Sequence, residues 1–226
     1  MRLTRDVAPP IATRPASYQK DTIMKLAEIA FACYIYSHMS NYDRSYLRFV
    51  EETSPRLDLR LERHQMALLK WLNDWGCRQF SKDYHGLAAK EIGEWYEEVS
   101  VRLFPVDKTL LSLSNGDFAL AEQAYDGLVT RTASRRKRAN GHETKVTIGP
   151  TGTAKILFAV RPNALIPWDD PIRQRFGEDN SARSYTNYLR AAKSHLEELR
   201  QNVIREATIS QTCLSCLADP RPALRR

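Results

Sequence analysis

The amino-acid sequence predicts an all-α protein. In several long segments, apolar residues recur at spacings of three and four, which is the pattern of helices with one buried face. No series of segments alternates apolar and polar residues as strands do. With 42% hydrophobic residues among 226, the chain has enough apolar material for one domain or two closely packed lobes. We expect a two-lobed helical fold.

The first half of the chain opens with an expected flexible arm at residues 1–16, because three prolines interrupt a stretch without periodicity. Residues 18–39 follow as a helix whose dense apolar positions predict that it is largely buried. Residues 41–55 are polar and broken, so we expect no regular element there. A second helix is predicted for residues 57–80, and His64 beside its apolar stripe is interpreted as a structural histidine.

Three further helices are predicted. One covers residues 84–103, and another covers residues 117–132 with Asp117 placed to cap it. A long helix over residues 185–204 carries an apolar stripe that we expect to close the core.

The predicted domain spans residues 17–206 and is followed by a tail at 207–226. The N-terminus has no secretory signal pattern, and no apolar run approaches the roughly 18 residues that a membrane span needs. We therefore expect a cytoplasmic protein without a membrane partner, and we expect a monomer.

The chain is basic, with 34 Lys and Arg against 27 Asp and Glu, a formal charge of +7 and a pI near 9.3. Such an excess is compatible with a polyanionic partner such as nucleic acid. It is equally compatible with a surface charge that only aids solubility.

The four cysteines are Cys33, Cys77, Cys213 and Cys216. Four thiols in a chain of this length do not form a disulfide framework, so a reducing compartment is the simpler interpretation. Cys213 and Cys216 have the spacing of half a zinc site, but no second Cys/His pair lies near them in the sequence. We expect neither a metal nor a cofactor.

A basic run is formed by Arg135, Arg136, Lys137 and Arg138. Runs of like charge are usually solvated loops. Four adjacent cations just before a glycine-bracketed turn are also suited to binding phosphates. Both interpretations stay open from the sequence.

The segment "IGPTGTAKILFAV", residues 148–160, places a glycine turn directly before an apolar helix. This is the layout of a helix-hairpin-helix, in which backbone N–H groups at the turn and at the helix N-terminus face an anion. A DNA phosphate fits that requirement. The candidate contacts to the DNA backbone are Gly149, Thr151, Gly152, Thr153 and Lys155, together with the basic run.

After a crossing segment, the chain continues as "WDDPIRQRFG", residues 168–177. Over residues 147–177, this order of glycine turn, apolar helix and acidic helix start resembles the helix-hairpin-helix DNA glycosylase superfamily. On that resemblance Asp169 corresponds to the family's catalytic aspartate, and Ile172 corresponds to the apolar anchor three residues later. Asp170 is the alternative catalytic carboxylate, although a residue before Pro171 is more simply interpreted as a helix cap.

The resemblance implies the monofunctional branch of this family. In the lyase-competent members of the family, a lysine at the hairpin forms a Schiff base with the sugar. Lys155 lies several residues after that position, and because each residue turns a helix by about 100°, we expect its side chain to point away from the pocket and toward the phosphate side. The cysteines of the iron–sulfur loop found in some members are also missing. Trp168 is a candidate for the base pocket, although a tryptophan beside a helix start is more often part of the core.

The function expected from the resemblance is excision of a damaged or modified base from DNA, either in repair or in defence against phage. Asp169 would stabilise the oxocarbenium-like transition state and orient water, after the base has left the stack. Two alternatives remain. One is a non-catalytic helix-hairpin-helix DNA-binding domain in which Asp169 only caps a helix, and the other is a helical module that binds an acidic protein.

Overall fold

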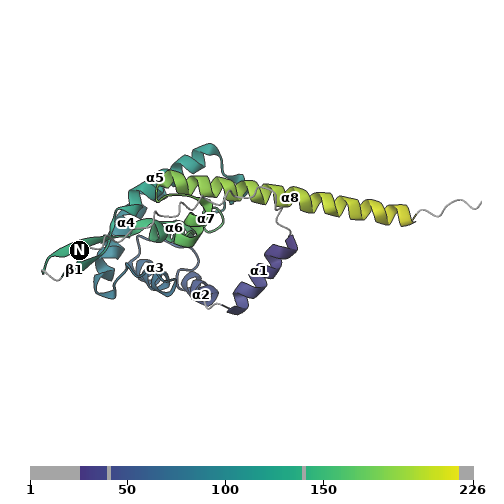
Figure 1. Cartoon of the computed structure of the whole chain (residues 1–226). Coiled ribbons are helices and arrows are strands. Elements are labelled where there is room, and N and C mark those ends of the chain that lie inside the picture. The colour runs from purple at the N-terminus through teal and green to yellow at the C-terminus, as the bar shows by residue number, and fades with distance from the viewer. Residues whose placement is uncertain (1–25, 40–41, 139–140, 219–226) are drawn as a thin grey trace, which may run out of the picture.

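The computed structural model describes residues 26–39, 42–138 and 141–218, and in these ranges the protein is mostly helical (Figure 1). The all-α prediction is confirmed. The predicted arm at residues 1–16 and the last eight residues of the predicted tail lie outside the described ranges. The α-helices are α1 (Leu26–Met39), α2 (Tyr42–Glu52), α3 (Glu62–Asp74), α4 (His85–Ser100), α5 (Asn115–Val129), α6 (Gly149–Val160), α7 (Asp170–Phe176) and α8 (Ala182–Ala218), with short 3-10 turns at Lys82–Tyr84 and Leu110–Ser112.

One antiparallel pair of strands, β1 (Thr132–Lys137) and β2 (Glu143–Thr147), interrupts the helices. The sequence analysis did not predict these strands. β1 changes from a buried start at Thr132 to fully exposed positions at its end, so it does not show the alternation by which a half-buried strand is recognised. The pair forms a β-hairpin at the opposite end of the molecule from the projecting part of α8 (Figure 1).

Several boundaries differ from the prediction. α2 occupies part of the segment 41–55, which was expected to be broken, because its apolar residues lie on one face and Phe49 is buried in the core. α1 is not a buried helix, since Phe31 and Tyr34 are 65% and 60% exposed. α8 continues to Ala218, so most of the predicted tail is helical.

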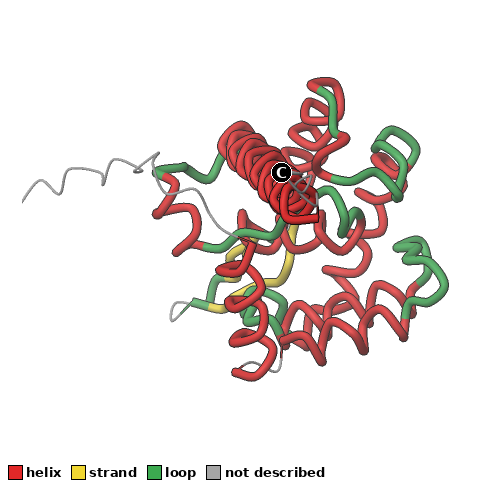
Figure 2. Tube along the Cα trace, turned by 90° about the vertical axis from the view of Figure 1, so that its right-hand side faces the viewer, coloured by secondary structure: helices red, strands yellow, loops and turns green. Residues whose placement is uncertain are grey.

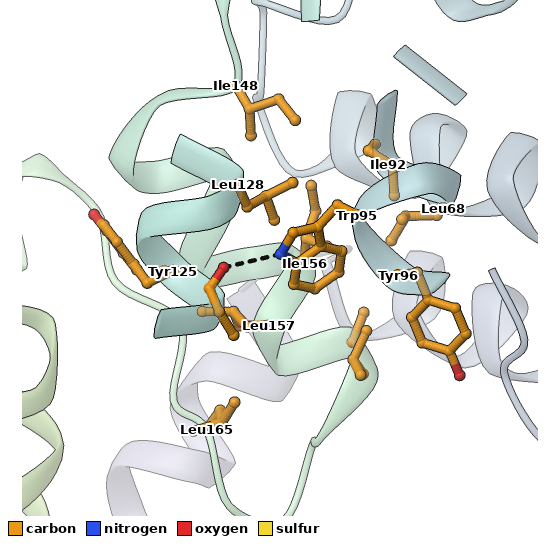
Figure 3. Packing of buried hydrophobic residues seen from close by; sticks show 14 of the residues in the cluster. Leu68, Ile92, Trp95, Tyr96, Tyr125, Leu128, Ile148, Ile156, Leu157 and Leu165 are labelled. Atoms are coloured by element: carbon orange, nitrogen blue, oxygen red, sulfur yellow. Dashed lines mark hydrogen bonds between the residues drawn. The ribbon is translucent and has the colours of Figure 1, made fainter. Parts of the chain in front are cut away.

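The buried residues form one hydrophobic cluster to which α2 through α6 and the first turns of α8 contribute, so the two predicted lobes share one core. Trp95 of α4 lies near its centre and is fully buried. Its indole Nε1 donates a hydrogen bond to the Ala124 carbonyl of α5 over 2.9 Å (Figure 3). A buried indole needs such a partner, and this bond therefore fixes α4 against α5.

A buried arginine fixes the C-terminal end of α6 through hydrogen bonds to two backbone carbonyls. Arg161 is 4% exposed, and its Nε and Nη1 donate to the carbonyls of Phe104 and Val160 over 2.7 Å and 2.8 Å. A buried guanidinium needs such acceptors, because an unpaired charge in the core is costly. α6 therefore ends at Val160, and the crossing segment that follows it begins from a fixed point.

The start of α5 carries a capping box. The cap is Ser114, rather than the predicted Asp117, and Asp117 lies three residues later, where its carboxylate accepts from the Ser114 backbone N–H. The same carboxylate accepts from Lys108 Nζ over 2.7 Å. Burial opposes ionisation of Asp117, but the hydrogen bonds from Lys108 and Ser114 outweigh it and lower the pKa of Asp117 to about 2.

This depressed pKa predicts an acid-sensitive contribution to stability. A carboxyl group with a lowered pKa stabilises the fold fully above its unfolded value near 3.8, and the contribution is lost as the pH falls through about 2. Between pH 6 and pH 2 the wild type should lose about 2 kcal/mol more unfolding free energy than Asp117→Asn, because a shift of one pKa unit corresponds to about 1.4 kcal/mol. Urea unfolding of both proteins at the two pH values measures this difference, and parallel pH dependences would contradict it.

Candidate active site

The glycine segment joins a strand to a helix. β2 ends at Thr147, and α6 begins directly at Gly149, whose φ of +69° is a conformation that favours glycine. The element before the turn is therefore β2 and not the first helix of a helix-hairpin-helix. The predicted helix–turn–helix layout is corrected here to strand–turn–helix, while the free N–H groups of the first turn of α6 remain.

Two of the predicted DNA-backbone contacts are buried. A Cβ on Gly152 would lie 2.6 Å from Gln79 Nε2 and 3.1 Å from Ile148 Cγ2, so this glycine is required for close packing. Thr153 is fully buried. This corrects the prediction for both residues, because neither one is accessible to a phosphate, whereas Gly149 and Thr151 are half-buried.

Arg173 of α7 links the start of α6 to the start of α7. Its guanidinium is 9% exposed and forms an ion pair with Asp170. The same group lies 5.5 Å from the ring centre of Trp168, and its Nη1 donates to Thr151 Oγ1 over 3.3 Å. Thr151 and Asp170, both predicted as site residues, are thus used to position the two helices.

Asp169 is the N-cap of α7. Its backbone is extended, and its Oδ1 accepts a hydrogen bond from the Ile172 N–H over 3.1 Å. The prediction that Asp170 is the cap was therefore wrong by one residue, because Pro171 occupies the second helical position and not the first. Capping uses one carboxylate oxygen of Asp169 and leaves the other available for a ligand.

Asp169 and Lys155 line the same pocket, which we call the Asp169 pocket. Its volume is about 360 Å³, within the range of pockets that bind small molecules. Aromatic and apolar side chains from α1, the end of α3, the segment before α7 and α7 itself supply most of the wall. The lining residues are Tyr36, Trp75, Lys155, Pro167, Trp168, Asp169 and Ile172.

Lys155 faces this pocket, contrary to the prediction that it turns toward the phosphate side. Its Nζ donates to the Trp75 carbonyl over 2.6 Å and lies 5.4 Å from the centre of the Trp75 ring. α6 packs against α3, so a residue in the middle of α6 reaches the end of α3. Burial raises the pKa of the neighbouring Cys77 thiol, and Lys155 partly offsets this effect.

Trp168 belongs to the core and to the pocket at once. It is 1% exposed, and its ring stacks on Tyr188 at 5.7 Å and meets the ring of Tyr185 edge-on at 5.2 Å. Burial raises the pKa of Tyr188 to about 12, and the negative charge of Asp169 acts in the same direction. Trp168 is therefore a rigid wall, because neighbouring rings fix its orientation.

The predicted basic run lies in the β-hairpin. Arg135, Arg136 and Lys137 are exposed in β1, and Arg138 follows at the turn. Arg135 pairs in register with Lys145 of β2, and directly opposed like charges destabilise a strand pair. The only ion pair recorded for this run within the described residues joins Arg135 to Glu143 over 3.6 Å.

Two walls of the Asp169 pocket, Tyr36 and Trp75, were not predicted. Trp75 was assigned to an apolar helix stripe, Tyr36 lay within a helix predicted to be largely buried, and no spacing relates either residue to a carboxylate far along the chain. Within the described ranges, no group of His, Cys, Asp and Glu could hold a metal ion, and no helix is long and apolar enough to cross a membrane. The side chains of Cys213 and Cys216 lie outside the described part of the structure.

No protein-family model, curated protein or solved structure matches this chain. The resemblance of residues 147–177 to DNA glycosylases therefore rests on the sequence pattern alone. The Asp169 pocket and the basic β-hairpin are the two features of the structure that bear on function.

Substitution of Asp169 should separate its capping role from any chemical role. Asn is as good a cap as Asp, so Asp169→Asn should leave the unfolding free energy nearly unchanged, whereas Asp169→Ala should lower it by about 1 kcal/mol. Urea unfolding monitored by circular dichroism measures both values. If Asn were as destabilising as Ala, the carboxylate charge rather than the cap geometry would be stabilising α7.

Proposed function

We propose that this protein binds DNA and hydrolytically excises a damaged or modified base in the Asp169 pocket. The observation that carries the proposal is the position of Asp169 in a pocket that the half-buried Trp75 also lines, with no hydrogen bond recorded within the described residues to its second carboxylate oxygen. An extruded base loses its stacking in the duplex, and aromatic surfaces can replace that stacking. The pocket volume of about 360 Å³ is sufficient for a single base.

In the proposed reaction, the bond between C1′ of the sugar and the base breaks, and the base leaves with the bonding electron pair. Positive charge develops on the sugar, and a carboxylate beside C1′ stabilises it. Water then attacks C1′ and transfers a proton to Asp169 or to solvent, which leaves an abasic site.

The monofunctional route is supported by the position of Lys155. Its ammonium is held by the Trp75 carbonyl over 2.6 Å. Attack on C1′ would require it to break this hydrogen bond and to lose a proton first. Lys155 instead supplies a fixed positive charge to the pocket, which suits the phosphate that flanks an extruded nucleotide.

The basic β-hairpin is the proposed contact to the DNA backbone. Arg135, Lys137 and Lys145 lie on one face of the hairpin by strand alternation, with Glu143 as the only carboxylate on that face among the described hairpin residues. Neighbouring phosphates would relieve the repulsion between Arg135 and Lys145. Two-stranded ribbons of this kind are suited to the grooves of a duplex.

The second candidate function is non-catalytic DNA binding, and the capping bond of Asp169 to Ile172 favours it. This bond accounts for an aspartate at position 169 without any chemistry. Both functions use the basic hairpin, so binding assays alone do not distinguish them. Release of a base does.

Base release should depend on the charge of Asp169. With duplexes that carry varied base modifications, the wild type should release one class of base and leave an abasic site that is cut only after alkali. Asp169→Asn should lower the release rate at least about 100-fold, since electrostatic groups of this type contribute about 10²–10³, while DNA affinity changes only a few fold. Mass spectrometry of the freed base measures the rate.

Asp107→Asn is the matched control for this experiment, because it removes an exposed carboxylate that does not line the Asp169 pocket. Its release rate should stay close to that of the wild type. Equal rates for the wild type and Asp169→Asn would remove the catalytic assignment. Absence of base release from every modified duplex would favour the non-catalytic function.

The β-hairpin should determine DNA affinity. Arg135→Gln combined with Lys137→Gln should weaken binding to duplexes of any sequence about tenfold or more, and it should reduce the slope of log K against log salt by about 2, since each phosphate contact contributes about 0.9. Fluorescence anisotropy at several salt concentrations measures both effects.

Arg200→Gln combined with Arg205→Gln removes the same charge from the far, projecting part of α8 (Figure 1). This control should change the affinity less than about threefold, because exposed charges beyond a Debye length are largely screened. If both double variants lost affinity equally, binding would follow net charge, and the hairpin would not be the interface.

A further inference from the structure

A second pocket lies at the opposite end of α3 from the Asp169 pocket. His64, in the first turn of α3, lines this second pocket, and Trp75, directly after the last residue of α3, lines the Asp169 pocket. At about 1.5 Å per residue, the two residues are about 16 Å apart along the helix axis. The second pocket has a volume of about 460 Å³, and we call it the arginine pocket. It is lined by Ser54, Pro55, Arg56, Leu57, Asp58, Arg60, Leu61, Arg63, His64, Tyr96, Ser100, Val101 and Arg161.

Positive charge dominates this lining. Its arginines outnumber its carboxylates four to one. The single carboxylate, Asp58, is already bound by Arg60 Nε and Nη2 over 2.8 Å and 2.7 Å. The hydrogen bond from the Arg60 side chain also lowers the pKa of Asp58. No carboxylate of the lining therefore remains to neutralise the other three arginines, Arg56, Arg63 and Arg161.

Arg161 brings a charge into the buried wall of the pocket. It is 4% exposed, and burial lowers its pKa, with the nearby charge of Arg56 acting in the same direction. An anion bound at the pocket would offset the repulsion between these two charges. Arg56 and Arg63 are exposed at the rim.

His64 lies beneath the lining of the pocket. It is 2% exposed, and its Nδ1 lies 3.0 Å from the Asp58 nitrogen and 3.1 Å from the Asp58 carbonyl oxygen, so it accepts from the first or donates to the second according to the tautomer of the ring. Nε2 is buried and has no hydrogen-bond partner within the described part of the chain. A buried polar atom without a partner is unfavourable, and a ligand group that reaches it would pair with it.

We propose that the arginine pocket binds the phosphate group of a small phosphate-bearing molecule. Guanidinium groups pair with tetrahedral oxyanions through two parallel hydrogen bonds, and the pocket offers guanidinium groups at both its rim and its wall. Its volume exceeds that of one phosphate ion, so the ligand carries a further organic part. The exposed guanidinium groups of Arg56 and Arg63 at the rim can pair with a terminal phosphate, and the buried charge of Arg161 acts on it from the wall. This site is independent of the proposed base excision.

Isothermal titration of the full-length protein with sodium pyrophosphate, at constant ionic strength, tests the site. The wild type should bind with one-to-one stoichiometry, and Arg56→Gln combined with Arg63→Gln should weaken binding at least tenfold. These two residues are exposed, so the variant should retain its fold, which circular dichroism checks. Nitrogen NMR of the imidazoles provides a second readout, in which the Nε2 signal that is missing in His64→Gln should shift when pyrophosphate binds to the wild type.

Arg135→Gln combined with Lys137→Gln is the matched control, because it removes the same charge from the β-hairpin. It should bind pyrophosphate within about twofold of the wild type and lose DNA affinity, while the pocket variant should keep its DNA affinity and its base release. Equal loss of pyrophosphate binding in both variants would overturn the site in favour of general charge attraction. No pyrophosphate binding, or loss of DNA affinity in the pocket variant, would also overturn it.

Discussion

The buried guanidinium of Arg173 holds the two helix starts of the candidate active site together. It connects Asp170 at the start of α7, the ring of Trp168 before that helix and Thr151 in the first turn of α6. These contacts fix the direction in which the chain enters α7, and Asp169 lies at that entry. The Asp169 carboxylate caps α7 through one oxygen. The Arg173 contacts that fix the start of α7 therefore also fix this carboxylate at the pocket. A burial this deep is tolerated only because an ion pair and an aromatic face replace water around the guanidinium.

α6 is shared by the two pockets. Lys155 in its middle reaches the Asp169 pocket, and Arg161 after its last residue reaches the arginine pocket. Figure 2 shows α8 nearly end-on with the other helices around it. Among these elements, α6 packs against α3 and α5. One central helix thus presents cations to two separate pockets, and its apolar residues Ile156 and Leu157 stay fully buried between them.

The sequence predicted those elements whose signals are local. α4 and α5 follow from their apolar spacing, the end of α6 follows from Pro162, and the start of α7 follows from two aspartates before Pro171. The assignment of the cap failed by one residue, because the side chains of Asp169 and Asp170 are equally able to cap a helix. The strands were missed because β1 carries the basic run, which is not an apolar alternation, and becomes exposed after Ser134. The buried state of α1 was wrongly predicted because apolar content does not specify which partner covers a helix.

The direction of Lys155 also depended on tertiary packing. A helix offset of one residue predicts a rotation of about 100°, but which side faces a pocket depends on where α3 ends. The same reason explains why Tyr36 and Trp75 were not linked to Asp169, since contacts between distant segments leave no periodic trace in a single sequence. His64 was assigned a structural role from its surroundings on the helix, and the unpaired Nε2 became visible only with the fold.

The central claim is that Asp169 stabilises positive charge on a sugar in its pocket. It is tested most directly by comparing two duplexes that differ at one position, one with a neutral tetrahydrofuran abasic site and one with a cationic pyrrolidine in its place. The wild type should bind the cationic duplex at least tenfold more tightly, because a site complementary to the transition state prefers its charge, and Asp169→Asn should lose that preference while still binding the neutral duplex. Equal affinity of the wild type for the two duplexes would contradict the claim.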